Sequence, residues 1–351
     1  MKRILVTGGG GFIGSHTCLT LLENEYELYV LDSFINSSPQ SLKTIEQILK
    51  SKNINIENKL HVYKGDLRDK ERLNDIFSDA LLSGIPIQGV IHFAGLKAVK
   101  ESIENPLLYW DSNVNGAINL LKAMEENNCK IMVFSSSATI YGLASDNPLV
   151  ENSNISPINP YGSTKVAIEN ICKDVFNASK NEWRIVNLRY FNPIGAHSSG
   201  LIGENPLGSP NNIFPIILNV ALGKQKIFKV FGNNWPTYDG TCIRDYIHVV
   251  DVAEGHLKAL EYLMKNKSQI LNLNLGTGIG TSVLDLIKSF QIINKLSIPY
   301  VFSEPRKGDA SCVVADNTLA KKILGWSPNR TIDDACLDGW NWTSKNPNGF
   351  S

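Results

Sequence analysis

The sequence predicts an α/β fold in which a doubly wound parallel sheet is followed by a smaller, loop-rich α/β lobe. Through the first half of the chain, short apolar segments alternate with helical segments, which is typical of a parallel sheet covered by helices on both faces. From about residue 192 onward, loops rich in Gly, Pro and Asn interrupt this alternation. We therefore expect two parts, residues 1–190 and residues 191–351, with about 240–270 packing back on the first part.

Each element of the first part follows from its local pattern. The apolar, β-branched segment 2–7 predicts a buried first strand, and segment 89–95 predicts a strand that ends in small residues. The strands are expected at 2–7, 27–31, 59–67, 89–95, 130–135 and 184–190, and the helices at 15–23, 42–51, 70–82, 107–127 and 160–179. In such folds ligands bind beyond the carboxyl ends of the strands.

A glycine-rich turn follows the first strand, and Gly8, Gly11 and Gly14 have the spacing G-x-x-G-x-x-G. Glycines allow the backbone to approach a pyrophosphate closely, and the helix after them offers free N–H groups and a positive dipole end. Asp32 ends the second strand, where an acid accepts bonds from an adenosine ribose and repels a 2′-phosphate. Because residues 33–38 contain no Lys or Arg, we expect a Rossmann-type site for NAD rather than NADP.

A tyrosine and a lysine stand four residues apart at Tyr161 and Lys165, after the serine cluster that ends in Ser137. Residues at this spacing share one face of a helix. A phenol ordinarily titrates near pH 10, and a neighbouring ammonium lowers that pKa by stabilising phenolate. This spacing alone is common on solvated helix faces. With the serine and the glycine motif, it predicts a general base that takes a proton from an alcohol.

Composition excludes several other classes of protein. The 351 residues include 34 Lys and Arg and 34 Asp and Glu, so no charge excess favours nucleic acid or an anionic membrane. No apolar run approaches the roughly 20 residues of a membrane span, and the chain opens directly into a strand without a signal-peptide pattern. The six cysteines are scattered without CxxC pairs. We expect a cytoplasmic enzyme with reduced thiols and no metal site.

Together these motifs resemble the UDP-glucose 4-epimerase family of extended short-chain dehydrogenases/reductases. The resemblance covers residue 1 to about residue 350 and depends on segments 8–17, 92–99, 135–139, 161–165, 189–193 and 244–248. It implies interconversion of UDP-glucose and UDP-galactose through a 4-keto sugar, with transient hydride transfer to tightly held NAD. It also implies a homodimer.

The resemblance implies a role for each matching residue. Tyr161 takes the proton of the sugar 4-hydroxyl, Lys165 lowers the tyrosine pKa and holds the nicotinamide ribose, and Ser137 binds the reacting oxygen. The cofactor residues implied are Gly8, Gly11, Phe12, Ile13, Gly14, Asp32, Asn36, Asp66, Leu67, Phe93, Ala94, Gly95, Lys97, Ser112, Tyr161, Lys165 and Tyr190. The nucleotide-sugar residues implied are Ser137, Tyr161, Tyr190, Asn192, Asn212, Phe231, Arg244, Arg306, Asp309 and Val313.

Two positions set this chain apart within the family pattern. Ser112 stands where an asparagine is common in the family, and Asn113 is the next residue. The sequence therefore does not decide which of the two contacts the cofactor. Val313 is the fourth residue after Asp309, where a tyrosine in the family excludes an N-acetyl group. The smaller valine predicts that UDP-N-acetylhexosamines are also accepted, unless Val313 only fills a core gap and another side chain closes the pocket.

Other functions fit the sequence less well. A 4,6-dehydratase of the same fold usually carries Asp-Glu directly after the Ser/Thr position, and here Ala138 and Thr139 follow Ser137. A decarboxylase is a further alternative. An NAD-sensing regulator on this fold commonly loses the tyrosine or the lysine, and both are present. His92 and His197 are expected to be structural, since the tyrosine already provides a base.

Overall fold

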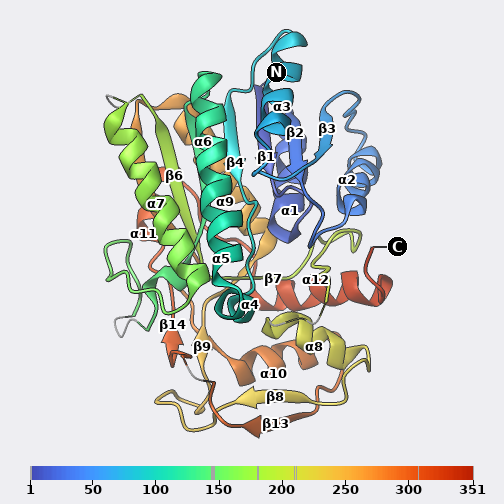
Figure 1. Cartoon of the computed structure of the whole chain (residues 1–351). Coiled ribbons are helices and arrows are strands. Elements are labelled where there is room, and N and C mark those ends of the chain that lie inside the picture. The colour runs from blue at the N-terminus through green and yellow to red at the C-terminus, as the bar shows by residue number, and fades with distance from the viewer. Residues whose placement is uncertain are drawn as a thin grey trace.

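The computed structural model describes residues 2–143, 147–179, 182–208, 210, 212–306 and 308–350. Its centre is a seven-stranded parallel sheet in the order β11-β6-β5-β4-β1-β2-β3 (Figure 1). The strands are β1 (Lys2–Thr7), β2 (Tyr26–Asp32), β3 (Leu60–Lys64), β4 (Gly89–His92), β5 (Ile131–Ser137), β6 (Arg184–Tyr190) and β11 (Gln269–Leu275). The chain order reverses direction between β1 and β4, which is where doubly wound sheets bind ligands.

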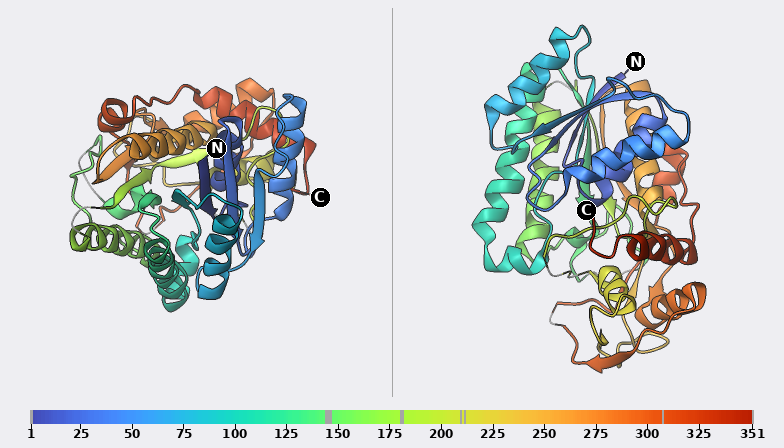
Figure 2. Two further views of the ribbon diagram at one scale, coloured as in Figure 1. Left: turned by 90° about the horizontal axis from the view of Figure 1, so that it is seen from above. Right: turned by 90° about the vertical axis from the view of Figure 1, so that its right-hand side faces the viewer.

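Helices cover both faces of this sheet (Figure 2). One face packs against α1 (Phe12–Glu23), α2 (Pro39–Ser51), α9 (Val249–Lys265) and α11 (Thr318–Leu324). The other face packs against α3 (Lys70–Leu82), α6 (Gly116–Glu126) and α7 (Pro160–Ala178). The predicted α/β class with a Rossmann-type parallel sheet is therefore confirmed.

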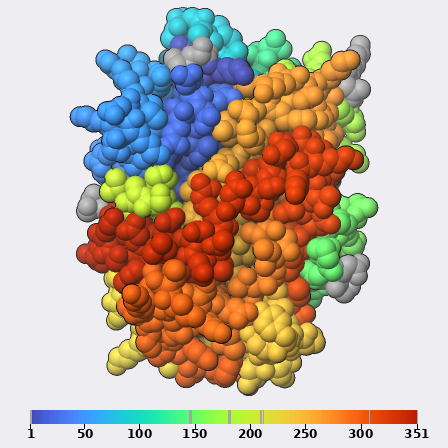
Figure 3. Space-filling view, turned by 180° about the vertical axis from the view of Figure 1, so that it is seen from behind, coloured from blue at the N-terminus to red at the C-terminus, as the bar shows by residue number. Residues whose placement is uncertain are grey.

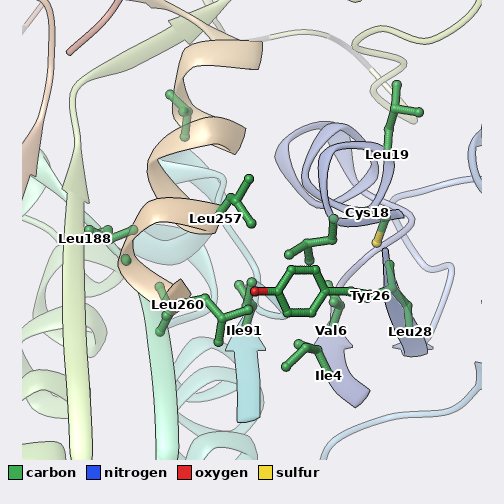
Figure 4. Packing of buried hydrophobic residues seen from close by; sticks show 14 of the residues in the cluster. Ile4, Val6, Cys18, Leu19, Tyr26, Leu28, Ile91, Leu188, Leu257 and Leu260 are labelled. Carbon is green, nitrogen blue, oxygen red and sulfur yellow. The ribbon is translucent and has the colours of Figure 1, made fainter. Parts of the chain in front are cut away.

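The two core layers reflect the period-two alternation of the buried strands. In β1, Ile4 and Val6 belong to the core layer under α1 and α9, whereas Leu5 belongs to the layer on the opposite face. Figure 4 shows the first layer, where Leu257 and Leu260 of α9 lie over the strands beside Cys18 and Leu19 of α1 and the Tyr26 ring. All six cysteines of the chain are free thiols.

The remaining elements form the lower part of the molecule in Figure 1 and enclose a third apolar cluster. Its helices are α8 (Ile213–Ala221), α10 (Val283–Asn294) and α12 (Ile332–Lys345). Its paired strands are β7 (Asn192–Ile194) with β10 (Tyr246–His248), β8 (Phe228–Phe231) with β13 (Tyr300–Ser303), and β9 (Ile243–Arg244) with β12 (Thr281–Ser282) and β14 (Cys312–Val313). The second part of the chain also contributes α9 and β11 to the central sheet and its helical layer. The division into two parts near residue 190 therefore stays a prediction.

Several element boundaries differ from the sequence prediction, and the first two differences below have an identifiable reason. The helix after the glycines begins at Phe12 rather than Ser15, because Gly11 is already the extended N-cap. Strand β4 ends at His92 rather than residue 95, because the N–H groups of Phe93 and Ala94 both turn to the Thr7 carbonyl, at 3.0 and 3.1 Å. The strand predicted at 59–67 extends only over Leu60–Lys64.

The single long helix predicted over 107–127 is wrong. In the structure this stretch of chain is divided into α5 (Pro106–Tyr109), a π-helical stretch at Trp110–Asn115 and α6. A further short helix, α4 (Val99–Glu104), comes before them. Asn113 lies in the π-helical stretch, where its side chain accepts from the Leu96 N–H at 2.8 Å and donates to the Leu96 carbonyl at 3.1 Å. A long-range contact thus overrides the local helical preference, and such π-helical stretches are frequent at functional sites.

None of the helices in the described ranges combines the length and the hydropathy that a membrane span requires.

Candidate active site

The predicted site residues gather at the carboxyl ends of four neighbouring strands. Thr7 ends β1, Ser137 ends β5 and Tyr190 ends β6, while Phe93 directly follows β4. These strands lie side by side in the sheet, so the glycine turn, the Phe93 loop and the serine cluster open on one edge. This edge is where a doubly wound sheet places its ligand.

The glycine turn is packed so closely that side chains are excluded from it. Gly8 has φ +71°, and a Cβ there would lie 2.6 Å from the Ala94 nitrogen. A Cβ on Gly14 would lie 2.2 Å from the Gly8 carbonyl oxygen. Gly11 caps α1 without a side-chain bond, so no capping side chain occupies the first N–H groups of the helix. This geometry suits a pyrophosphate.

Asp32 ties the glycine turn to the loop that follows β2. Its Oδ2 accepts from the Gly10 N–H at 2.8 Å, and its Oδ1 accepts from the Phe34 N–H at 2.8 Å and the Ser37 hydroxyl at 2.9 Å. A carboxylate has about four acceptor positions. Oδ2 therefore has room for one further donor, and Asn36 in the same loop is exposed.

Other predicted cofactor residues surround this turn. The Asp66 carboxylate binds the Arg68 guanidinium through two bonds, at 3.0 and 2.8 Å, and these bonds hold its pKa below the ordinary range. Leu67 is buried beside it. The exposed Lys97 reaches Glu204 at 3.4 Å. Both carboxylate oxygens of Asp66 thus already accept hydrogen bonds from Arg68. The predicted contact of Asp66 with the cofactor therefore involves its backbone.

Asn113 is the residue that clamps the loop after β4. Besides its two bonds to Leu96, its Nδ2 donates to the Thr164 hydroxyl at 3.1 Å, and the side chain is buried. Thr164 lies on α7 next to Lys165. The Asn113 amide therefore connects the loop after β4, at Leu96, with α7. Ser112, next to Asn113, is partly exposed. Its contact with the cofactor stays a prediction.

Tyr161, Lys165 and Ser137 meet where α7 crosses the end of β5. Asn159 caps α7 by accepting from the Gly162 N–H at 2.8 Å, which places Tyr161 in the first turn. The Ser137 hydroxyl is near enough to the Tyr161 phenol to lower its pKa, and it accepts a hydrogen bond from the Thr139 hydroxyl at 2.9 Å. The Lys165 ammonium donates to the Ser135 carbonyl at 2.7 Å and lies 5.7 Å from the centre of the Tyr161 ring.

Burial shifts the pKa values of both members of this pair. Burial raises the pKa of the Tyr161 phenol above 10, and the Ser137 hydrogen bond only partly opposes this. Burial also lowers the pKa of Lys165 to about 8, with the Glu169 carboxylate opposing that shift. As pH rises, the ammonium therefore loses its proton before the phenol does. Lys165 is not among the groups that lower the Tyr161 pKa in the ligand-free chain, and its proposed effect on the phenol stays a prediction.

Replacing Lys165 with methionine is expected to lower kcat/KM for UDP-galactose about 100-fold, a loss within the usual range for acid–base residues. In the native protein kcat/KM should fall as pH rises through about 8, because the ammonium of free enzyme loses its proton there. The variant lacks this fall, so its optimum moves to higher pH, where the phenol ionises. Profiles from pH 6 to 10 test this, with Lys165→Arg as the charge-retaining control. An unchanged alkaline limb in the methionine variant contradicts the assignment.

Behind the catalytic helix lies a buried ion pair that sequence reasoning missed. Glu169 accepts two bonds from Arg189, at 3.0 and 2.6 Å, and one from the Ser136 hydroxyl at 2.5 Å. Arg189 also donates to the Tyr141 hydroxyl at 3.0 Å. The spacing of one helical turn between Lys165 and Glu169 can be seen in the sequence and suggests that Glu169 lies near the lysine. No local pattern identifies Arg189 as the ion-pair partner of Glu169. The network fixes α7 against β5 and β6.

His92 and Tyr190 are buried, and His197 is half-buried. The Thr7 hydroxyl lies 2.8 Å from Nδ1 of His92, whose pKa burial lowers to about 3, so the ring is neutral and structural as expected. His197 bonds the Ser199 hydroxyl at 2.8 Å. The Tyr190 hydroxyl lies 2.8 Å from Nε2 of His256, which also contacts the Phe93 ring, with 4.6 Å between ring centres. Tyr190 therefore keeps only its backbone and ring edge for a ligand.

The predicted nucleotide-sugar residues form two groups. Val313 on β14 pairs with Arg244 on β9, and the Arg244 guanidinium lies 3.8 Å from the Asp309 carboxylate. The Arg306 guanidinium stacks on the Phe231 ring at 3.8 Å.

A contact connects these groups with the catalytic helix. A Cβ on Gly308, between Arg306 and Asp309, would lie 3.3 Å from Ile158, three residues before Tyr161. Asn192 on β7 bonds the Asp245 carbonyl through its own N–H at 3.0 Å, and Asn212 is exposed at the start of α8. The loop that carries Arg306 and Asp309 thus lies close to the segment just before Tyr161.

Comparison with known proteins agrees with this geometry. The family model described as GDP-mannose 4,6 dehydratase matches residues 5–338. UDP-glucose 4-epimerase 2 of Arabidopsis thaliana is 47% identical over 350 residues, which cover 100% of this chain and 97% of the relative.

Two solved structures superpose on nearly the whole chain. The UDP-glucose 4-epimerase of Stenotrophomonas maltophila, with bound NAD and formylated UDP-arabinopyranose, has a TM-score of 0.93 and 39% identity, with 99% of each chain covered. The enzyme of Bifidobacterium longum, in complex with NAD+ and UDP, has a TM-score of 0.90 and 42% identity, covering 99% of this chain and 100% of that one. The chain belongs to the family that the dehydratase model describes and, within it, to the UDP-glucose 4-epimerases.

Proposed function

We propose that this protein interconverts UDP-glucose and UDP-galactose by oxidising and re-reducing carbon 4 of the sugar, with Tyr161 as the acid–base residue. The observation that carries the proposal is the position of the Lys165 ammonium 5.7 Å from the centre of the Tyr161 ring, on the helix that crosses the end of β5 at Ser137. These groups lie at the same sheet edge as the glycine turn and Asp32. A proton acceptor and a dinucleotide site at one edge suit hydride chemistry at an alcohol.

The residues of the chain divide the proton chemistry among them. Tyr161, as phenolate, accepts the proton of the 4-hydroxyl, and the C4–H bond breaks as its electron pair leaves as hydride. Ser137 donates to the reacting oxygen and stabilises its changing charge. In the second half, Tyr161 returns the proton to the oxygen of the 4-keto sugar, which has turned over, and C4 regains hydride on its other face. Protons and electrons balance, and no net oxidation occurs.

The cofactor fits the residues that surround the glycine turn. NAD, when bound, accepts the hydride and returns it, and its positively charged oxidised ring favours phenolate at Tyr161. Gly8, Gly11 and Gly14 leave room for the pyrophosphate, and the spare acceptor position of Asp32 takes an adenosine ribose hydroxyl. Lys165 holds the nicotinamide ribose.

The nucleotide diphosphate is assigned to the two arginines. A guanidinium binds phosphate oxygens in bidentate fashion, and Arg244 and Arg306 are held at the site region by Asp309 and the Phe231 ring. Asp309 accepts from a ribose hydroxyl, while Asn192 and Asn212 contact the sugar and the nucleotide. Arg244 exchanges its 3.8 Å contact with Asp309 for the diphosphate in this proposal.

The dehydratase chemistry named in the matching family model is not favoured here. Elimination of water from a 4-keto sugar needs an acid–base pair beside the serine. Ala138 and Thr139 occupy those positions, and the Thr139 hydroxyl is occupied in holding Ser137 at 2.9 Å. The epimerase assignment therefore requires no further catalytic group.

We also propose that the protein is a cytoplasmic homodimer. The family membership supports this proposal. Light scattering of the purified protein tests the dimer, and a monomer at micromolar concentration contradicts it.

The cofactor is expected to be used without being consumed. Incubation with UDP-galactose should yield UDP-glucose, while the absorbance of free NADH at 340 nm stays flat as product accumulates. NADH in proportion to product instead identifies a dehydrogenase. After removal of bound nucleotide, NAD but not NADP should restore turnover, because the Asp32 carboxylate repels a 2′-phosphate. Equal restoration by NADP contradicts the role of Asp32.

A further inference from the structure

Two segments from the second part of the chain lie across the mouth of the dinucleotide site. A narrow cavity of about 20 Å³ has Gly10, Gly11 and Phe12 and the loop 36–38 on one side. The other side consists of residues 203–206 and Phe350, with Lys97 at the edge. Such a cavity holds about one water molecule, so the two sides are nearly in contact. We call segments 203–206 and 346–350 together the strap.

The strap is built onto α12 through a tryptophan. The Trp342 indole N–H donates to the Glu204 carbonyl at 3.2 Å, and its ring centre lies 4.7 Å from that of Phe350. A Cβ on Gly203 would lie 2.4 Å from the same indole ring. Both segments of the strap therefore pack on one rigid side chain, and Figure 3 shows the yellow-green chain around residue 200 between the blue helices and the red α12.

The two segments also interlock with each other. Gly349 has φ +80°, and a Cβ there would lie 2.1 Å from the Asn205 side-chain oxygen. Only glycine combines this left-handed conformation with so close an approach. Residue 205 thus rests directly on the backbone that carries Phe350.

The strap is fastened to the dinucleotide domain on its other side. Glu204 is almost buried and forms an ion pair with Lys97 at 3.4 Å, and Lys97 is one of the proposed cofactor residues. The Phe350 ring packs against the core layer under α1. It also lines the narrow cavity opposite Gly10, Gly11 and Phe12 of the glycine turn and the loop 36–38. The strap therefore bridges the two parts of the molecule at the end of the site where the adenosine ribose is assigned.

We propose that the strap is part of the cofactor site and slows release of the adenosine half of NAD, with Phe350 and Asn205 as its contact residues. The proposal rests on the proposed use of NAD. A flat aromatic ring and an amide suit a planar base with a polar edge. A cofactor that is regenerated in every turnover does not need to leave between turnovers. A strap that covers it costs the reaction nothing and keeps it bound.

The test compares the rate at which NAD leaves the protein. Wild type and the Phe350→Ala variant are loaded with NAD and gel-filtered, and the NAD released over time is measured enzymatically. Release from F350A should be about tenfold faster, as expected for loss of one aromatic contact, and Phe350→Tyr should restore slow release. Asn205→Ala, which removes only an amide, should release NAD about threefold faster.

A matched control and a check of folding make the outcomes separable. Phe302→Ala removes an equally large ring from exposed strand β13, away from the strap, and should release NAD at the wild-type rate. Circular dichroism confirms that each variant is folded. Wild-type release rates in both F350A and N205A overturn the strap proposal and leave NAD use intact. A wild-type protein that binds no NAD overturns the proposed function, and the strap proposal with it.

Discussion

Replacing Tyr161 with phenylalanine is expected to lower the epimerisation rate by about 1,000-fold or more, in the upper range for loss of an acid–base residue. The change removes only the hydroxyl, so the aromatic ring keeps its packing in the first turn of α7. The Ser137 hydroxyl keeps its bond from Thr139, so the serine stays in place. Turnover is measured with UDP-galactose at saturating concentration, and NAD content is measured on the same sample.

The control for this prediction is a tyrosine outside the site. Tyr300 is exposed on β13, and Tyr300→Phe removes the same hydroxyl without touching the proposed site. That variant should turn over at the wild-type rate. Near-normal turnover in Tyr161→Phe, with NAD still bound, would exclude the phenol as the base.

Much of the fold was predictable because its signals are local. The helix at 70–82 and the strands at 2–7 and 184–190 have the predicted bounds, since an apolar segment or an N-capped amphipathic segment determines each one. The helix predicted at 107–127 was not predictable in its true form. Its π-helical stretch accompanies the contact between Asn113 and Leu96, 17 positions apart, and no local pattern reports such a contact.

The site shows the same division between local and long-range information. The Gly8–Gly14 spacing and the Tyr161–Lys165 spacing are local, so the sequence could place these residues on a turn and on a helix. The pKa shifts of Tyr161 and Lys165 depend on burial by the whole fold, which no local pattern reports. The strap could not be foreseen, because segments 203–206 and 346–350 meet only through Trp342 on α12.

Val313 is expected to let the protein accept UDP-N-acetylhexosamines in addition to the plain hexoses. Its side chain is partly buried and packs in a small apolar cluster with Ala138 and Phe191. Ala138 directly follows Ser137, so this cluster borders the proposed reacting carbon. Val313 on β14 also pairs with Arg244 on the neighbouring strand β9, and Arg244 is the residue assigned to the diphosphate. A side chain between those two positions is suited to limit the size of the sugar.

Replacing Val313 with tyrosine should therefore lower turnover of UDP-N-acetylgalactosamine on the order of 100-fold, because forcing a ring and an acetamido group into one volume costs roughly 1–3 kcal/mol. Turnover of UDP-galactose should fall far less, since the added ring reaches neither Tyr161 nor the glycine turn. The ratio of kcat/KM for the two sugars measures the effect, and Val313→Ala, which keeps the volume open, should leave that ratio near the wild-type value. If wild-type protein converts UDP-galactose but neither N-acetyl sugar, another side chain closes the pocket and Val313 only fills the core.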